Sequence, residues 1–529
     1  MSADEAVLKL APGQRPLMVI MVMLGTTIYT ASILISSALL PQMQGAFAAT
    51  QDEISWTMTF NIVATAVMTP MTGWLSDRFG RRQTMFWCAV MFTISTLFCG
   101  LAGSLEEMIL WRVIQGAAGA PLVPLGQTIL LDAYPRRQHG SVISFYGMAN
   151  MIGPVLGPTL GGQISEAFGW RWGFWMIMPV ALVACIGFWF VLPRDRPEGK
   201  VKLDWTGFIT LSVAIAAAQL VFSRGQRLDW FQSTEVWISA FLAITAIYMF
   251  TVHALTTDRP FIRLKLLSDR NYALGLALVF LYGMLNFAPI VLLPPLLQQH
   301  ANYPDSAIGA FVGWRGAGAA IGFLIAMFTS RVDPRAMMVF GSLLQAYAGW
   351  SMMSLDLNID TRTLAFESFL QGVSIGVAWV PMTVVTFSTL QPQYRAEAMS
   401  MFHLLRNFGS SLFISVAVAE IVRTSGANYA RMTELASYYN RVWDLPWVSG
   451  AWSMETAAGL ARLSREINRQ ATVIGYQNAF LMYTIVALAA VPLCLLAKLP
   501  RAEAKPADKP VELEVAPAAG SDAVGHRRS

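Results

Sequence analysis

Long apolar runs dominate this sequence and limit what it can fold into. The chain has 529 residues, of which 55% are hydrophobic and only 13% are charged. Soluble domains carry about 25% charged residues, and about 20 consecutive apolar residues let a helix cross a bilayer. The sequence therefore predicts an all-α polytopic membrane protein. Fourteen spans are expected, at residues 17–40, 54–76, 83–104, 107–131, 140–164, 171–192, 204–222, 233–255, 271–299, 306–330, 336–356, 363–388, 396–421 and 474–498.

The distribution of positive charge predicts how these spans are oriented. With the N-terminus inside, 24 of the 37 Lys and Arg residues fall in cytoplasmic segments and 10 fall outside. Cytoplasmic loops of membrane proteins carry an excess of Lys and Arg. Both termini are therefore expected in the cytoplasm.

Short strings recur at nearly constant distance along the chain. "QGAAGAPLVP" begins at Gln115, and "QGVSIGVAWVP" begins at Gln371. "SDRFGRR" is echoed by "TSRVDPR", and "YPRRQHGS" by "YRAEAMS". Internal repeats are typical of transporters, whose substrate site lies between the repeats. The repeat predicts a cytoplasmic N-terminus (1–16), a six-helix bundle (17–192), an insert of two helices with linkers (193–270), a second six-helix bundle (271–498, with an exterior loop at 422–472) and a disordered cytoplasmic tail (499–529).

Three motifs resemble those of a known family. "GWLSDRFGRR", from Gly73 to Arg82, resembles the cytoplasmic signature loop of the major facilitator superfamily, and "WRVIQGAAGAPLVP" is similar to its span-four motif. "GPVLGPTLGG", from Gly153 to Gly162, resembles the span-five motif of its antiporters. Fourteen spans with a long loop before the last resemble the EmrB-type branch of drug:proton antiporters. The resemblance implies a major facilitator fold of 6 + 2 + 6 helices and proton-driven export of hydrophobic or amphipathic drugs and toxic compounds.

The same resemblance implies a location and partners. Members of this branch are multi-pass proteins of the bacterial inner membrane that confer antibiotic resistance. They work in a tripartite efflux pump with a periplasmic adaptor protein and an outer-membrane channel. The exterior segment from Val422 to Gln470 is a candidate contact for the adaptor, and a small packed cap over the transporter is the alternative. No cofactor, metal or nucleic acid is expected.

The signature loop, which we call the gate loop (73–82), predicts a cytoplasmic gate. Gly73 allows close helix approach, and Gly80 permits a tight turn. Asp77 can accept hydrogen bonds at a helix N-terminus in the other half, while Arg78 and Arg82 can pair with nearby acids. Such contacts exist only when the cytoplasmic side is shut, so the loop is expected to stabilise the outward-facing state. A positive anchor at the membrane surface is the simpler alternative.

The span-five motif predicts one bare helix face. Gly153, Gly157 and Gly161 recur every four residues, with Pro154 and Pro158 beside them. Residues four apart lie on the same face of a helix, so a neighbouring helix can pack closely there or slide. The prolines remove backbone hydrogen bonds and favour a bend.

Proton coupling requires a group that changes charge, and span one lacks the usual one. The branch commonly carries a carboxylate there, in a pattern like "D-x-T-x-x-N-x-A-L-P", whose polar positions correspond to Ser32 and Ser37. We therefore expect the carrier elsewhere. Glu367 in span twelve is preferred because it is furthest from a loop, and Asp132 at the inner end of span four is the next choice. Ionisable groups inside the membrane are functional hypotheses by default.

The repeat places Arg112 of span four at nearly the same depth as Glu367. In the superfamily that the chain resembles, helices at these two positions face each other across the central cavity. We therefore expect Arg112 to lie opposite Glu367 and to lower the pKa of its carboxyl group. Glu420 and His403 are weaker alternatives for the carrier. Further polar residues of the spans are candidates for lining the cavity: Thr30, Ser32, Asn61, Gln115, Asn286, Arg315, Arg406 and Asn407.

Other functions remain open at this level. A dedicated exporter of one metabolite or siderophore would share the same fold. A polytopic membrane enzyme would need a polar catalytic cluster, yet the five histidines are scattered along the chain. An ATP-driven pump is disfavoured because the sequence holds no G-x-x-x-x-G-K-[ST] string, and the repeated halves favour alternating access over a channel.

Overall fold

The computed structural model describes residues 13–135, 138–193, 202–301, 303, 305–328, 332–354, 360–437, 439–445 and 452–498, and all regular structure within them is helical. The predicted N-terminal segment before residue 13 and the tail at 499–529 lie outside these residues. The long helices are α1 (Gln14–Ala46), α2 (Gln51–Met68), α3 (Met71–Phe79), α4 (Arg81–Leu101), α5 (Leu105–Gly119), α6 (Leu122–Ala133), α7 (His139–Phe168), α8 (Trp170–Trp175), α9 (Met178–Val191), α10 (Trp205–Arg224), α11 (Thr234–Thr256), α12 (Arg270–Pro295), α13 (Asp305–Phe328), α14 (Pro334–Met353), α15 (Thr361–Phe387), α16 (Arg395–Leu435) and α18 (Ala457–Leu496). Short helical turns are η3 (Trp230–Gln232), η4 (Leu264–Ser268), η5 (Leu296–His300), η6 (Pro392–Tyr394) and η7 (Arg441–Asp444).

Most of these helices are suited to a bilayer. In the described part of the chain, 11 helices are long and apolar enough to cross a membrane. The three remaining predicted spans are also helical, as α2 with α3, α7 and α14, but they fall outside that set. The predicted span 54–76 is interrupted because α2 ends at Met68 and α3 begins after Pro70. The all-α polytopic fold is confirmed, whereas the count of fourteen spans stays a prediction.

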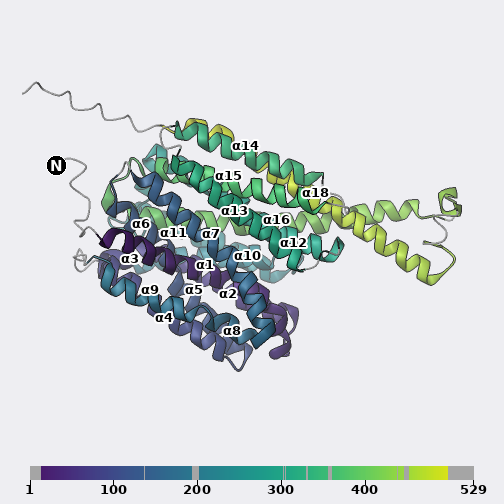
Figure 1. Ribbon diagram of the computed structural model, residues 1–529, viewed down its shortest axis with the longest axis horizontal. Helices are drawn as coiled ribbons and strands as arrows, with labels where there is room; N and C mark the ends of the chain where they lie inside the picture. The colour runs from purple at the N-terminus through teal and green to yellow at the C-terminus, as the bar shows by residue number, and fades with distance from the viewer. Residues whose placement is uncertain are drawn as a thin grey trace, which may run out of the picture.

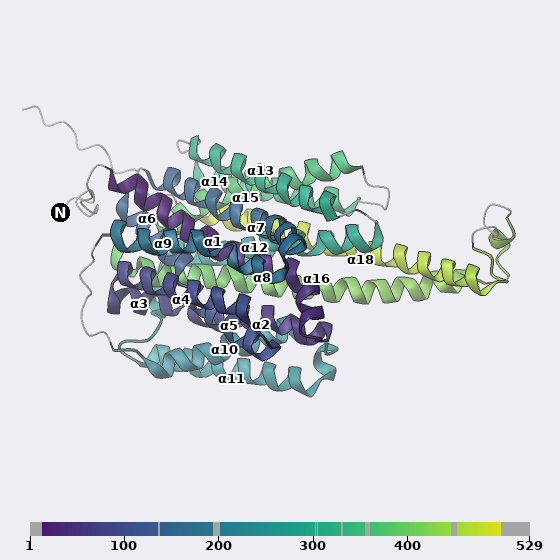
Figure 2. The same cartoon turned by 60° about the horizontal axis from the view of Figure 1, so that its bottom comes forward.

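Two halves, one formed by α1 to α9 and the other by α12 to α18, lie side by side and repeat the same packing (Figure 1, Figure 2). In the first half, α1 packs against α7 and α9, and α5 against α2 and α4. In the second half, α12 packs against α16 and α18, and α15 against α13 and α14. The internal repeat seen in the sequence therefore corresponds to a repeat of helix pairs.

A glycine at the same repeat position brings helices together in each half. A Cβ atom on Gly116 of α5 would lie 2.4 Å from the carbonyl oxygen of Asn61 in α2. A Cβ atom on Gly372 of α15 would lie 2.0 Å from the carbonyl oxygen of Arg315 in α13. Both distances exclude any side chain, so the two glycines permit a close helix crossing in each half.

The two inserted helices stand at the edge of the molecule (Figure 2). α10 contacts α2 of the first half and α16 of the second half, while α11 packs mainly on α10. The Gln219 side chain of α10 donates to Ser411 Oγ, and Ser415 Oγ donates to the carbonyl oxygen of Phe222, both across to α16. The insert is therefore attached through α10, which bridges the two halves.

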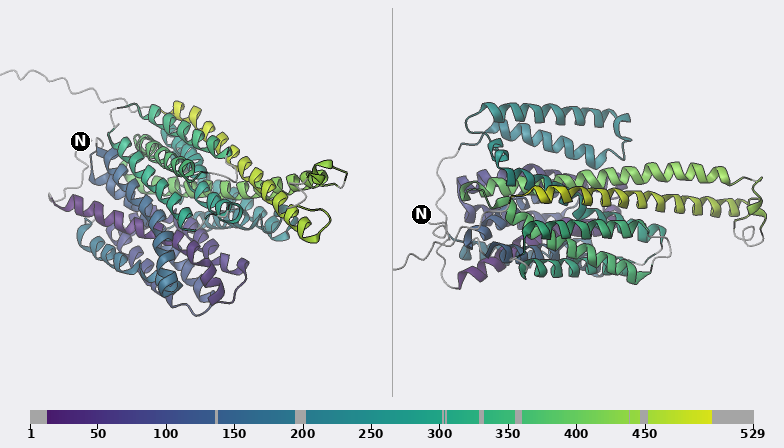
Figure 3. Two further views of the ribbon diagram at one scale, coloured as in Figure 1. Left: turned by 45° about the vertical axis from the view of Figure 1, so that its right-hand side comes forward. Right: turned by 90° about the horizontal axis from the view of Figure 1, so that it is seen from above.

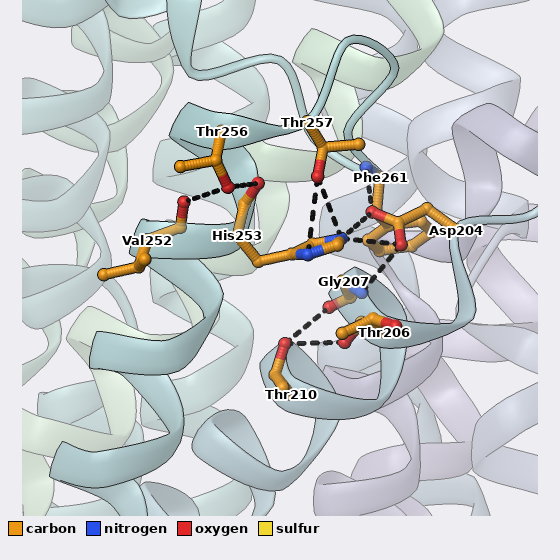
Figure 4. Close-up of polar contacts among 9 residues, drawn as sticks. All are labelled: Asp204, Thr206, Gly207, Thr210, Val252, His253, Thr256, Thr257 and Phe261. Atoms are coloured by element: carbon orange, nitrogen blue, oxygen red, sulfur yellow. Dashed lines mark hydrogen bonds and ion pairs between the residues drawn. The ribbon is translucent and has the colours of Figure 1, made fainter.

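One carboxylate joins the start of α10, the end of α11 and the linker that follows α11 (Figure 4). Asp204 caps α10 by accepting from the backbone N–H of Gly207 at 3.0 Å. The same carboxylate accepts from the N–H of Phe261 at 3.0 Å and lies 2.9 Å from Nε2 of His253. Burial by itself would raise the pKa of Asp204, but hydrogen bonds from Gly207, His253 and Phe261 outweigh it and lower the pKa. Asp204 thus links α10, α11 and the segment leading to α12 while remaining ionised.

α16 and α18 project far beyond the other helices on one side (Figure 1, Figure 3). α16 has 41 residues, which corresponds to about 60 Å, twice the hydrocarbon thickness of about 30 Å. Their projecting parts pair with each other, as between Tyr429 and Ser464, whose hydroxyl oxygens lie 2.9 Å apart. We call residues 422–470 the exterior hairpin. The predicted exterior segment is therefore largely a continuation of two membrane helices.

Candidate functional site

A cavity lies where the two halves and the insert meet. Its volume is about 230 Å³, whereas two hollows within the second half measure about 30 and 20 Å³. The lining comes from α1, α2, the start of α6, α7, α10, α12 and α16. Apolar side chains form most of the wall, among them Ile33, Leu34, Met58, Phe287 and Ile414. Its position between repeats and its apolar wall are those of a site for a small, mostly apolar molecule.

Some predicted cavity residues lie in this wall and others do not. Thr30, Asn61, Arg406 and Asn407 line the cavity, and so does Pro154 of the span-five motif. Other predicted cavity residues are buried and form hydrogen bonds within one half. Ser32 donates to the carbonyl of Tyr29, Gln115 donates to Thr96, and Arg315 donates to Gln371 and to the carbonyl of Asn286. The polar character of a span residue therefore did not decide which way it faces.

The structure also adds cavity residues that the sequence did not single out. Gln219 belongs to the insert, which gave no sequence signal of contact with a site. Tyr29 donates to Thr65 Oγ1 at 3.1 Å across the first half. His403, a weak alternative from the sequence, lines the cavity and places Nε2 2.8 Å from Oε1 of Gln127 in the other half.

Arg112 and Glu367 are not brought together. Arg112 is buried within the first half, where its guanidinium donates to Gln115 Oε1 and to the carbonyl of Thr57. Glu367 is buried in the second half and accepts from Ser351 Oγ of α14 at 2.6 Å. Neither residue is among those lining the cavity. The repeat gave the two residues similar depth, but the rotation of α5 and α15 points their side chains into their own halves.

The carboxyl group of Glu367 is buried and has few polar partners among the described residues. Within the described part of the chain, its Oε2 is buried with no hydrogen-bond partner, and its Oε1 accepts from the hydroxyl of Ser351. An ionised carboxylate buried without a cation is costly, and a bound proton removes that cost.

Asp132 bridges the two halves near the end of α6 and the starts of α4 and α16. It accepts from Arg81 at the start of α4 in its own half and from Arg395 at the start of α16 in the other half. The side chains of Asp132 and Arg395 are only 10% and 7% exposed, so water competes weakly for this pair. Nearby, Leu131 and Ile143 of the first half share a buried apolar cluster with the second half. The two halves are thus joined at this end, the end that the sequence predicts to be cytoplasmic.

The gate loop lies at the same junction. A Cβ atom on Gly73 of α3 would lie 3.1 Å from the Cα of Glu397 in the first turn of α16, so Gly73 permits this close approach. Gly80 takes φ 84°, a conformation that favours glycine, between α3 and α4. Asp77, on the last turn of α3, is close enough to interact electrostatically with Glu397. The guanidinium of Arg82 instead lies over the ring of Trp189 in its own half, 5.0 Å from the centroid.

Arg78 and Pro158 add less to this picture. Arg78 is half-buried on α3. Arg81, which the sequence interpretation passed over, supplies the contact to an acid that was expected of Arg78 and Arg82. The side chain of Pro158 lies outside the part of the chain that the structure describes.

The span-five motif packs directly on α1. A Cβ atom on Gly153 would lie 2.4 Å from Thr30 Oγ1 and 2.6 Å from the carbonyl oxygen of Thr27. For Gly157 the carbonyl oxygen of Ala31 would be 2.9 Å away, and for Gly161 the nearest atom of Ile35 would be 3.2 Å away. Contact is therefore tightest at Gly153, beside the cavity residue Thr30.

We expect Gly153→Ala to impair both stability and transport. The added methyl group must push α7 away from α1, and overpacking of this kind costs about 1–3 kcal/mol. Gly162→Ala is the matched control, because a Cβ atom there would meet nothing within 4 Å. Thermal unfolding of the purified proteins and export from cells would measure the effect. Equal behaviour of the two variants would show that the α1–α7 contact tolerates widening.

Comparison with known proteins places the chain among transporters. Residues 21–414 match the family model of the Major Facilitator Superfamily. The Multidrug export protein EmrB of Escherichia coli (strain K12) is 28% identical over 503 residues, which cover 92% of this chain and 96% of that protein. The Fatty acid resistance protein FarB of Neisseria gonorrhoeae is 28% identical over 504 residues, covering 92% and 95%.

A solved structure shares the fold. The human organic anion transporter MFSD10 (TETRAN) superposes with a TM-score of 0.60 at 17% identity, covering 90% of this chain and 100% of that one. The family model spans most of the chain. The two packed halves of the chain repeat each other, as the sequence motifs predict. The chain therefore belongs to the Major Facilitator Superfamily.

Proposed function

We propose that this protein is a proton-driven exporter of hydrophobic or amphipathic drugs and toxic compounds. The observation that carries the proposal is the apolar cavity between two repeated halves whose cytoplasmic ends are joined. Relatives named for multidrug export and for fatty acid resistance support the choice of export. We place the protein in the bacterial inner membrane with both termini in the cytoplasm, in line with its positive charges.

Alternating access follows from where the cavity walls come from. Residues of both halves line the cavity, so rocking one half against the other changes which end is open. The Asp132–Arg395 contact must break when the cytoplasmic side opens, because its two partners belong to different halves. We propose Glu367 as the proton carrier, supported by its buried and uncompensated carboxyl group. Arg112 would then act within the first half and not as a direct partner of Glu367.

Export from cells and from vesicles tests this function. Cells with and without the protein are compared in a drug-susceptibility panel, and the purified chain is assayed in proteoliposomes with an imposed pH gradient. Resistance to several unrelated apolar compounds and flux that requires the gradient are the expected results. Resistance confined to one compound would favour a dedicated metabolite or siderophore exporter, and flux without a gradient would refute proton coupling.

We also propose that the exterior hairpin contacts a periplasmic adaptor protein of a tripartite pump. Exposed apolar and aromatic side chains along it are suited to a protein interface, among them Leu435, which is 67% exposed, and Tyr439, which is 96% exposed. Its arginines Arg423, Arg431 and Arg462 are also exposed. The adaptor would pass the exported compound to an outer-membrane channel.

Removing the exterior hairpin is expected to abolish co-purification with the adaptor. The structure allows a clean deletion, because the carbonyl of Ile421 lies 2.8 Å from where a Cβ atom of Gly475 would be, so a short linker can join Ile421 to Ala471. Pull-down from cells expressing both proteins gives the measurement, and vesicle flux checks that the shortened transporter still works. Undiminished co-purification would assign the adaptor contact to another surface.

A further inference from the structure

The cavity carries positive charge without a matching acid. Arg406 lines it, and the described residues that line it include no aspartate or glutamate. The hydroxyl groups of Tyr282, Tyr146 and Tyr29 interact electrostatically with Arg406. His403, one turn earlier on α16, also lines the cavity, and its Nδ1 is buried without a partner among the described residues.

The guanidinium of Arg406 has only weak internal partners. Its Nη2 and Nε donate to one oxygen, Asn407 Oδ1, at 3.1 and 3.3 Å. It lies over the ring of Trp379, 5.6 Å from the centroid. Among the described residues, no ion pair includes Arg406. A cation in the membrane interior is costly unless an anion or several oxygens compensate it.

Two other arginines in the membrane show the contrast. Arg112 and Arg315 are almost fully buried, at 1% and 6% exposure, and neutral oxygens inside their own halves surround them. Arg406 instead faces the cavity, where a ligand can reach the donors that Asn407 leaves free. Five N–H donors in a planar fork match a carboxylate or sulfonate.

From this geometry we propose that the cavity selects amphipathic organic anions, with Arg406 binding the anionic group and the apolar wall binding the body. The inference rests on the proposed export function and names its substrate class. Ile33, Leu34 and Met58 on one side and Phe287 on the other provide the apolar surface. A cationic compound of the same shape would meet Arg406 with like charge and no carboxylate.

Three probes with one naphthalene body test the charge. 2-Naphthoate, 2-naphthylmethanol and 2-naphthylmethylammonium are titrated calorimetrically against the purified full chain in nanodiscs. We expect the anion to bind at least about tenfold more tightly than either of the others, the scale of a charge-assisted hydrogen bond. Arg406→Gln should remove this preference, and Arg406→Lys should keep part of it.

The controls separate charge from folding and from transport. Arg406→Gln should bind the neutral alcohol unchanged, which shows that its cavity is intact. Arg362→Gln, at an exposed arginine at the start of α15, should keep the full anion preference. Equal affinity of the parent chain for anion and cation, or unchanged naphthoate binding by Arg406→Gln, would overturn the proposal. Flux of the same probes is measured separately in proteoliposomes, and absence of flux for all three would count against the export function alone.

Discussion

Asp132→Asn is expected to open the cytoplasmic side and to cut export. Asparagine keeps the shape of the side chain but removes the charge that holds Arg81 and Arg395. The pair is partly buried, so its loss should cost the closed state about 1–3 kcal/mol, between exposed and buried ion pairs, or about a 5- to 150-fold change in population. A cysteine introduced as Ala120→Cys, in the cavity wall, should then react faster with a membrane-impermeant maleimide applied from the cytoplasmic side.

Variants of the partners show which contact matters. Arg395→Ala should resemble Asp132→Asn, because Arg395 is the partner from the other half. Arg81→Ala should have a smaller effect, since it leaves the contact between halves in place. Asp204→Asn is a matched control at the same membrane face, where the carboxylate joins only the insert and its linker. Normal export and unchanged labelling in Asp132→Asn would mean that apolar packing alone closes this side.

Glu367→Gln is expected to abolish proton-driven export while substrate still binds. The amide fills the same space beside Ser351 but cannot release a proton. Loss of a required proton-transfer group typically lowers a rate by about a hundredfold or more. Flux in proteoliposomes under a pH gradient and calorimetric binding of one exported compound would measure the two effects. Binding should stay close to that of the parent chain, because Glu367 does not line the cavity.

A matched control and a fallback accompany this test. Glu420→Gln is the matched control, since Glu420 also accepts from a hydroxyl, that of Thr424 at 2.8 Å, but lies near the outer end of the membrane part of α16 and is less buried. It should keep its flux. If Glu367→Gln retains full pH-dependent flux, the carrier lies elsewhere, and Asp132 and His403 are then the groups to test, the latter because it joins both halves at the cavity.

Much of the fold could be predicted from the sequence because the bilayer imposes simple rules. Apolar length predicted helices that the structure places within a few residues, such as 204–222 against α10 (Trp205–Arg224) and 363–388 against α15 (Thr361–Phe387). The exterior segment was less predictable. Apolarity falls after residue 421, but the helix continues through Gly426 to Leu435, where a second helix pairs with it.

The candidate site was predicted less well because it depends on helix rotation and on contacts between distant segments. Depth along a helix follows from sequence position, and it correctly placed Arg112 and Glu367 inside helices. Direction does not follow from it, since both side chains turn into their own halves. The pairing of Asp132 with Arg395 likewise joins segments far apart in the chain, and no local pattern marks Gln219 as a cavity residue.

The exterior hairpin has a mechanical consequence for a transporter that rocks. α16 supplies His403 and Arg406 to the cavity and also continues as one arm of the hairpin. About 30 Å of that helix extends past a bilayer's hydrocarbon layer, so each degree by which the second half tilts swings the tip sideways by about 0.5 Å. In the proposed rocking cycle, a tilt of α16 at the cavity therefore moves the exterior hairpin, and a protein bound to the hairpin would be moved with it.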